Sequence, residues 1–269
     1  MGRRRARLEW RLVGLRGSRP VPFILLSSAR SGNNMVRTAV QQHPDVSFGN
    51  EFFLFAQSAR LEHLVPPALL PVLRKDPELA CVRMFRAQPG CRAAGFTLLY
   101  FHMREPEQLR LWRFLADFPN LRVIDLRRRN LFLQWLSLQE AMQSDLWLTT
   151  VDQPMPIMKP VELKADCFVA WMEEARRDRE FALGHMTRHE RLEVWYEDLV
   201  LDFAAQSHCI MRFLGLRELD LPPWSRKTGI KPLCERIAGF ESFAKAMAGL
   251  PGEQYFREAL DDERAGRQT

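Results

Sequence analysis

The sequence predicts an α/β fold of three layers, in which helices flank both faces of a central parallel sheet. Three observations predict it: short apolar runs that end in polar turns, amphipathic segments between these runs, and the alternation of the two along the chain. Short continuous apolar runs are typical of strands that are buried on both faces, as in a parallel sheet. Alternation of such runs with helical segments is typical of an α/β domain.

The elements follow from the local patterns in chain order. An apolar run after Pro20 predicts a first strand over 22–28, and apolar positions with helical spacing predict a helix over 34–42. Further strand-sized apolar runs and amphipathic segments predict strands at 79–85, 96–101, 121–126 and 192–195, and helices at 105–118, 131–144 and 162–181. The proline-rich stretch 145–161 is expected to be a loop, with a role as a lid or an acceptor-binding insertion.

The 269 residues contain no repeat, no low-complexity tract and no Gly/Ser linker. We therefore expect one domain over 21–269, preceded by a basic N-terminal segment over 1–20. The arginines of that segment predict a disordered tail, with contact to an anionic membrane as the open alternative. No secretory signal and no apolar run of about 20 residues is present, which favours a cytoplasmic protein. Five cysteines without CxxC or Cys/His ligand spacing argue against a disulfide scaffold and a metal site.

The distribution of charge narrows the class of partner. Residues 1–135 carry 22 basic and 10 acidic side chains, whereas residues 136–269 carry 17 and 23. A basic half indicates an anionic partner, such as a nucleic acid, a membrane or a small polyanion. We find no zinc finger, no RNP-type aromatic pair and no basic heptad region, so nucleic acid is disfavoured. The search therefore turns to loops that bind phosphate.

The turn after the first strand reads Ser27-Ser28-Ala29-Arg30-Ser31-Gly32-Asn33-Asn34. A strand that runs through a glycine turn into a helix presents unpaired N–H groups to an anion. Potential donors to a phosphate are the side chains of Arg30, Ser31, Asn33 and Asn34. The loop lacks the spacing, the lysine and the Ser/Thr of a Walker A motif.

Residues 24–34 resemble the 5′-phosphosulfate loop of sulfotransferases that use 3′-phosphoadenosine 5′-phosphosulfate (PAPS). The pattern is closest to the bacterial carbohydrate sulfotransferases of the trehalose and Nod-factor type. The resemblance implies a P-loop-like fold and a 5′-phosphosulfate site formed by Arg30, Ser31, Gly32, Asn33 and Asn34. Where Ser/Thr is usual in the family, this chain has the amide pair Asn33-Asn34.

Three later segments resemble the same family in the expected order, so the resemblance covers roughly residues 23–236. Residues 123–138 are similar to its 3′-phosphate segment, which implies that Arg128 and Ser137 hold the 3′-phosphate. Residues 194–199 and 213–216 look like its late strand–helix unit, which we interpret as structural. Lys231 and Arg236 resemble the basic C-terminal segment that closes over the cofactor.

The resemblance also implies the catalytic groups. Residues 48–53 look like the bacterial segment in which a glutamate before two phenylalanines is the general base, which corresponds to Glu51. His102 is the alternative base, because other family members use a histidine after the next strand. Arg30 and the loop amides would stabilise the charge that develops on the leaving phosphate, so no metal is required.

The predicted function is therefore transfer of a sulfuryl group from PAPS to a hydroxyl of a carbohydrate, lipid or small-metabolite acceptor, with 3′-phosphoadenosine 5′-phosphate (PAP) as product. Two alternatives stay open: a nucleotide kinase on a P-loop-like fold, and a non-catalytic relative that binds a nucleotide. The sequence makes no prediction of oligomeric state.

Overall fold

The computed structural model describes residues 2–13, 19–55, 63, 65–86, 90–102, 109–150, 152–153, 158–225 and 231–266, and only the backbone of 2–4, 11–13, 54 and 55. All structural statements concern these residues.

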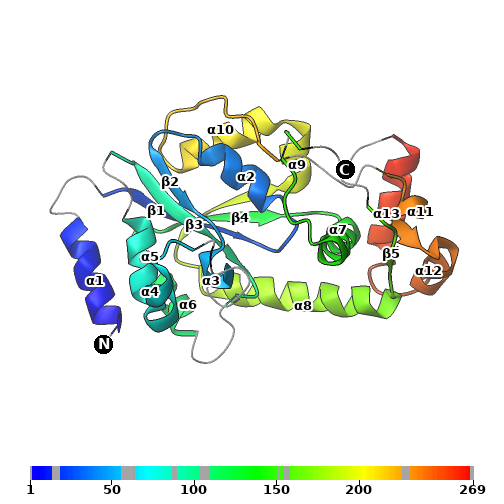
Figure 1. Cartoon of the computed structure of the whole chain (residues 1–269), viewed down its shortest axis with the longest axis horizontal. Coiled ribbons are helices and arrows are strands. Elements are labelled where there is room, and N and C mark those ends of the chain that lie inside the picture. Colours follow the sequence, from blue (N-terminus) through cyan, green and yellow to red (C-terminus); the bar gives the residue numbers. More distant parts are fainter. Residues whose placement is uncertain are drawn as a thin grey trace.

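A five-stranded parallel sheet forms the centre of the molecule (Figure 1), which confirms the predicted fold class. The spatial order of the strands is β2-β3-β1-β4-β6, with bounds β1 Val21–Ser27, β2 Val46–Gly49, β3 Ala93–Leu99, β4 Arg122–Arg127 and β6 Glu190–Trp195. The register places Ser27 level with Leu99 and with Leu126. The carboxyl ends of three adjacent strands therefore share one edge of the sheet, which is where ligands bind in α/β folds.

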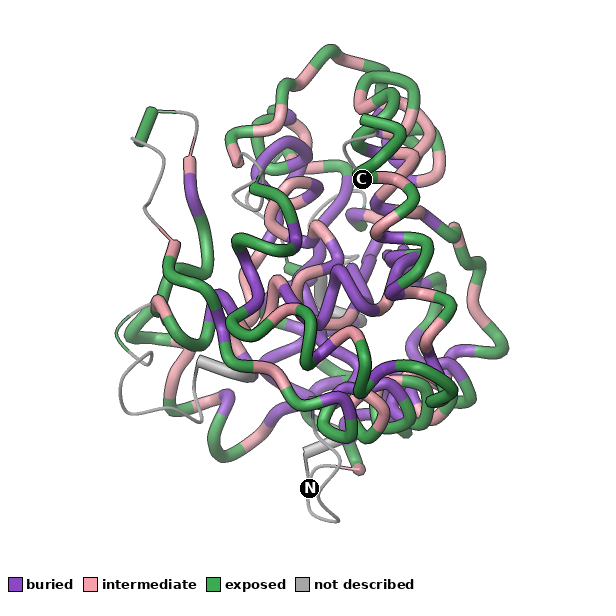
Figure 2. Tube along the Cα trace, turned by 90° about the vertical axis from the view of Figure 1, so that its right-hand side faces the viewer, coloured by how far each residue is buried: buried purple, intermediate pink, exposed green. Residues whose placement is uncertain are grey.

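Helices cover both faces of the sheet, because each strand alternates apolar side chains between two buried faces. The helices on one face are α2 Asn33–Val40, α9 Tyr196–Leu201 and α10 Phe203–Phe213. The helices on the other face are α1 Gly2–Val13, α4 Leu70–Lys75, α5 Pro77–Phe85, α6 Leu109–Ala116 and the second half of α8 Ala165–Gly184. Figure 2 shows the buried residues gathered between these layers.

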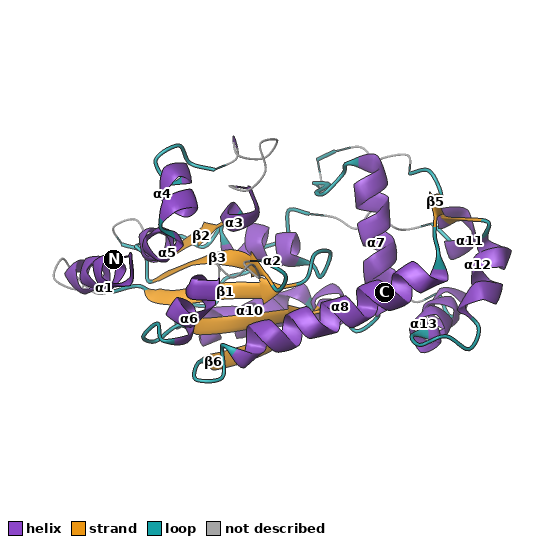
Figure 3. Ribbon diagram, turned by 90° about the horizontal axis from the view of Figure 1, so that it is seen from below, coloured by secondary structure: helices purple, strands orange, loops and turns teal. Residues whose placement is uncertain are grey.

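A third apolar cluster lies beyond the carboxyl end of the sheet (Figure 3). It joins α7 Leu131–Ser144 and the first half of α8 to α11 Leu233–Arg236, α12 Phe240–Met247 and α13 Glu253–Arg264. Four buried phenylalanines form its centre: Phe132, Phe168, Phe243 and Phe256. The short strands β5 Val161–Glu162 and β7 Ile237–Ala238 pair beside it, and the four-residue helix α3 Phe52–Phe55 follows β2. The last helices are thus tied to α7, which borders the phosphate loop.

Most of the predicted elements lie at or near the predicted residues, two predictions are wrong, and several elements were not predicted. The prediction of a strand at 79–85 is wrong, because the segment belongs to helix α5. Its start is fixed by Asp76, whose carboxylate accepts a hydrogen bond from the N–H of Leu79 at 3.1 Å, and by Pro77 at the first helical position. The expected disordered tail is wrong for 2–13, which form α1, and strand β2 was not predicted.

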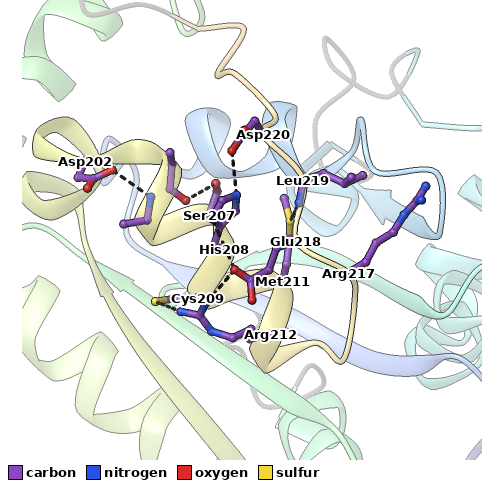
Figure 4. Close-up of polar contacts among 12 residues, drawn as sticks. Asp202, Ser207, His208, Cys209, Met211, Arg212, Arg217, Glu218, Leu219 and Asp220 are labelled. Atoms are coloured by element: carbon purple, nitrogen blue, oxygen red, sulfur yellow. Dashed lines mark hydrogen bonds and ion pairs between the residues drawn. The ribbon is translucent and has the colours of Figure 1, made fainter.

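The loop after α10 is held by side chains of that helix (Figure 4). Arg212 donates to Glu218 at 2.8 Å, and the ring of His208 lies 3.5 Å from Glu218 and 3.0 Å from Asp220. These contacts fix residues 214–220 at the surface of the layer.

The five cysteines differ in exposure: Cys81 is buried, Cys91 and Cys209 are half-buried, and Cys167 and Cys234 are exposed. Among the helices that the structure describes, none has both the length and the hydropathy that a bilayer-spanning segment requires.

Candidate active site at the phosphate loop

The predicted phosphate loop, residues 28–32, connects β1 to the start of α2. Arg30 and Gly32 both have left-handed backbones, with φ of 62° and 92°. A non-glycine residue in this region is uncommon and indicates a functional constraint. Two features exclude a side chain at position 32: the left-handed backbone, which favours glycine, and the ring of Tyr196, whose Cδ2 would lie 2.8 Å from a Cβ.

Side-chain hydrogen bonds hold this loop against α7. Gln134 donates from Nε2 to the carbonyl of Ala29 at 2.7 Å and to Oγ of Ser31 at 2.9 Å. Ser31 in turn donates to the carbonyl of Ser28 at 3.0 Å. The hydroxyl of Ser31 is therefore engaged in shaping the loop.

Arg30 connects the two segments that were predicted to bind the two phosphates. Its Nε donates to Oγ of Ser137 on α7 at 3.0 Å, and its Nη1 donates to the carbonyl of Trp147 at 2.7 Å. The structure thus brings Arg30 and Ser137 together, although 107 residues separate them.

The three consecutive arginines after β4 have different environments. Arg127 and Arg129 lie over the ring of Trp195, at 4.0 and 4.9 Å from its centroid. Arg127 is 3.4 Å from Glu193, and Arg129 makes two bonds, of 2.7 and 2.9 Å, to Asp198. Both guanidinium groups therefore have a carboxylate partner.

Arg128 has none of these partners and is 9% exposed. Its guanidinium lies over the ring of Tyr196, 4.5 Å from the centroid, and its Nε is buried without a hydrogen-bond partner in the described part of the chain. Burial lowers the pKa of Arg128, and the nearby Arg236 lowers it further, while Tyr196, Glu197 and Glu140 raise it. A buried arginine stays charged, so this donor calls for an anion.

Arg236 lies close to Arg128, whereas Lys231 is exposed and has no place beside them. Arg236 is buried and donates from Nε and Nη2 to the two carboxylate oxygens of Glu140, at 2.7 and 2.8 Å. Burial lowers the pKa of Arg30 and the charge of Arg128 lowers it further, which shows that Arg30 is also close. Lys231 is exposed and lies 4.0 Å from Glu235. We call Arg30, Arg128, Arg236 and Glu140 the basic cluster.

Glu51, one of the two candidate bases, lies beside the start of α2. Its Oε1 accepts a hydrogen bond from Nδ2 of Asn33 at 2.5 Å. Next to it, Oδ1 of Asn34 accepts a hydrogen bond from Nη2 of Arg37 at 3.2 Å. Burial raises the pKa of the Glu51 carboxyl, while Arg37, the Asn33 amide and Arg30 act in the opposite direction. The side chains of Asn33 and Asn34 are thus both engaged on the side of the loop where Glu51 lies: Asn33 orients the carboxylate of Glu51, and Asn34 binds Arg37.

His102, the other candidate base, is buried in the turn after β3. Its Nδ1 accepts the N–H of Leu99 at 3.2 Å, and its carbonyl accepts the indole N–H of Trp112 at 3.1 Å. Burial lowers the pKa of His102 to about 3. Its contacts belong to the turn and to α6, and it makes no contact with the loop or the basic cluster among the described residues.

Two cavities border these residues. A pocket of about 310 Å³ lies at the carboxyl ends of β1 and β4, where Ser31, Gln134 and Arg128 line it. A groove of about 450 Å³ lies along β2, where Phe48, Phe52 and Met84 give it an apolar floor beside the loop that carries Glu51. In the described ranges no group of three or more His, Cys, Asp or Glu side chains could hold a metal ion.

Sequence reasoning missed three residues of the site, namely Gln134, Glu140 and Tyr196. Gln134 and Glu140 lie three residues before and after Ser137, so the helical repeat of α7 could have indicated them. Tyr196 is the first residue of α9 and directly follows Trp195, the last residue of β6, which is paired with Arg127 at the end of β4.

The chain is similar to several known proteins. The chain is 25% identical to nodulation protein H of Rhizobium meliloti (strain 1021) over 252 residues, which is 90% of this chain and 97% of that protein. A sulfotransferase from Alicyclobacillus acidocaldarius is 17% identical, with a TM-score of 0.48, over 94% of this chain and 100% of the other. The sulfotransferase domain of the Synechococcus PCC 7002 olefin synthase is 14% identical, with a TM-score of 0.48, over 92% and 96%. No protein-family model matches the chain.

Proposed function

We propose that the chain is a PAPS-dependent sulfotransferase, and that its basic cluster and phosphate loop bind the two phosphates of PAPS and PAP. Arg30 and the N–H groups at the start of α2 would receive the 5′-phosphate side, and Arg128 the 3′-phosphate. PAPS supplies an activated sulfuryl group whose leaving group is already a phosphate.

The buried guanidinium of Arg128 is the observation that carries this proposal. A donor that is buried and lacks a partner costs free energy, about 1–3 kcal/mol and more when the group is charged. Arg128 shares its surroundings with Arg30 and Arg236, and Glu140 is the carboxylate within the cluster. The cluster therefore carries a net charge of +2, which suits a bisphosphate and gives Arg128 the acceptors it lacks.

We propose further that Glu51 is the general base. It lies on the α2 side of the loop, bonded to Asn33, at a distance at which Arg30 affects its pKa. Arg30 would stabilise charge on the leaving phosphate, while Glu51 would accept the proton of the attacking hydroxyl. Two features of His102 favour Glu51 as the base: its Nδ1 is occupied by the N–H of Leu99, and burial lowers the pKa of its ring to about 3.

The acceptor is proposed to be a hydroxyl of a carbohydrate, a lipid or a small metabolite. The groove along β2 supports this proposal, because Gly49 and Phe52, on either side of the segment that carries Glu51, line it and it offers an apolar surface for the part of the acceptor that does not react. A cytoplasmic location stays a prediction from the sequence.

Arg30→Ala and Arg128→Ala test the cofactor site by calorimetry with PAP. Each should weaken binding by about 1.5–3 kcal/mol, the range for hydrogen bonds to charged groups. Arg212→Ala, which removes an exposed arginine paired with Glu218 on α10, is the matched control and should leave PAP affinity unchanged. Unchanged affinity in both folded site variants would refute the assignment. Preference of the wild-type protein for ATP over PAP would favour a kinase, and PAP binding without any turnover would favour a non-catalytic relative.

A further inference from the structure

We propose that Glu140 is a resident counter-ion of the cofactor site, which holds an arginine in the empty enzyme and thereby limits how tightly PAP binds. This inference rests on the proposed function, because it concerns the same basic cluster.

The geometry places Glu140 inside the site. It lies on α7 three residues after Ser137, so both side chains are on the same face of the helix. Glu140 is 5% exposed, and its two oxygens receive Nε and Nη2 of Arg236 at 2.7 and 2.8 Å. This is the planar edge with which an arginine binds a carboxylate or a phosphate through two parallel hydrogen bonds. That edge of Arg236 is therefore already taken by Glu140.

Glu140 also acts on the other two arginines of the cluster. Its charge raises the pKa of Arg30 and the pKa of Arg128, against the effect of burial. Glu51 bears on Arg30 and Glu197 on Arg128, but among the described residues Glu140 is the carboxylate that bears on all three arginines. One carboxylate thus keeps three buried, mutually repelling guanidinium groups together while no phosphate is present.

The carboxylate of Glu140 would repel a phosphate that enters the site, and it already occupies Nε and Nη2 of Arg236. The binding of the bisphosphate is then weaker than three unopposed arginines would make it. This matters for turnover, because a sulfotransferase must release PAP after each reaction and product release limits many enzymes. Glu140 thus stabilises the three arginines in the absence of phosphate and favours the release of PAP.

Glu140→Gln tests the inference, since it keeps the shape and removes the charge. We expect the dissociation constant for PAP, measured by calorimetry, to fall about tenfold, because one like charge is removed from a buried site. The gain should be smaller for adenosine 5′-phosphate, which lacks the phosphate that faces Arg128. The free variant should melt at a lower temperature than the wild type, because Arg236 is left buried without a counter-ion, and PAP should raise its melting temperature by more than it raises that of the wild type.

Glu78→Gln is the matched control, because Glu78 is also a buried acid paired with an arginine, Arg110 at 3.5 Å, but lies on α5 outside the site. It should lower stability and leave PAP affinity unchanged. Equal or weaker PAP binding by Glu140→Gln would overturn the inference and make Glu140 a positioning residue for Arg236. If wild-type protein binds no PAP, the proposed function fails before the variant is measured.

A second pair of variants decides the matter if Glu140→Gln does not fold. Arg236→Met leaves Glu140 buried, unpaired and facing the phosphates, so PAP binding should weaken strongly. Adding Glu140→Gln to that variant should recover part of the lost affinity. No recovery in the double variant would overturn the inference.

Discussion

Three arginines in a row, Arg127, Arg128 and Arg129, illustrate how position rather than residue type decides a role. Successive side chains of extended backbone point to opposite sides, so the first and the third share the ring of Trp195 while the second enters the basic cluster. The carboxylates of Glu193 and Asp198 neutralise the outer two. The middle arginine is left with a tyrosine ring and an unsatisfied N–H, which suits it to an exchangeable anion.

Glu51→Gln should reduce turnover by about 10²–10⁴-fold, the usual contribution of a general base, and leave PAP affinity nearly unchanged. The base must be ionised to accept a proton, so wild-type activity should fall on the acid side of a pKa above the ordinary value of 4.5. Burial favours protonated Glu51, so ionised Glu51 destabilises the folded protein at pH values above its raised pKa. This destabilisation decreases as the pH falls from that pKa toward 4.5. Glu51→Gln should therefore be at least as stable as the wild type at neutral pH. Steady-state kinetics against pH and thermal melts measure both effects.

His102→Asn is the comparison for Glu51. The pKa of about 3 means that His102 stays neutral at all pH values where the protein is assayed, so the acid limb of the activity profile should survive the substitution. Since the folded state disfavours the charged ring, the stability contributed by His102 is complete above about pH 6.5 and is lost as the pH falls toward 3. An inactive His102→Asn beside a fully active Glu51→Gln would exchange the two assignments.

At the scale of elements, α1 and α5 show why patterns mislead. Residues 79–85 are apolar except for the exposed Arg83, because α5 is packed between α1 and the sheet. A helix that is buried over most of its surface loses the periodicity that distinguishes it from a strand. The cap at Asp76 and Pro77 was the better signal. In α1, the arginines pointed to a solvated tail, but Ala6 and Trp10 provide a buried stripe four residues apart.

Trp10→Ala should therefore destabilise the protein by about 3–5 kcal/mol, the range for a large aromatic removed from a core. The ring of Trp10 is 5% exposed and lies 5.0 Å from that of Phe118 and 6.4 Å from that of Phe85. Leu8→Ala, at a position 58% exposed on the same helix, is the control and should change stability by no more than about 0.5 kcal/mol. Urea denaturation of the two variants measures the difference. A small effect of Trp10→Ala would mean that the helix contributes little to the fold.

At the scale of the whole molecule, segments that are far apart in the sequence form the site: Arg30 follows the first strand, Arg236 lies on α11, and both contact α7. The strand–helix alternation could be predicted, because it depends on neighbouring residues. The two segments proposed to bind the phosphates were identified by family resemblance and stay a prediction. The pairing of Arg236 with Glu140 could not be predicted, since 96 residues separate them and α11 is only four residues long. Arg236 was found through family resemblance, whereas its partner required the packing of α11–α13 against α7.

Phe243→Ala tests whether that packing serves the site. Phe243 on α12 is buried against Phe132 of α7, with ring centroids 5.8 Å apart, and against Phe256 of α13 at 5.6 Å. Its removal should cost about 3–5 kcal/mol of stability and should also weaken PAP binding, because Arg236 is held against α7 by this cluster. Thermal melts with and without PAP measure both effects. If stability falls while PAP affinity is unchanged, the C-terminal helices are independent of the site.

The distribution of thiols gives the protein two natural labelling positions. Cys81 is buried, and burial raises the pKa of its thiol well above the ordinary value, so an alkylating dye reaches it slowly. Cys167 and Cys234 are exposed, one near the start of α8 and the other two residues before Arg236 on α11. A fluorophore attached to Cys234 would show whether α11 moves when PAP is added, with Cys167 as a second labelling position, in a protein whose sequence has not been altered.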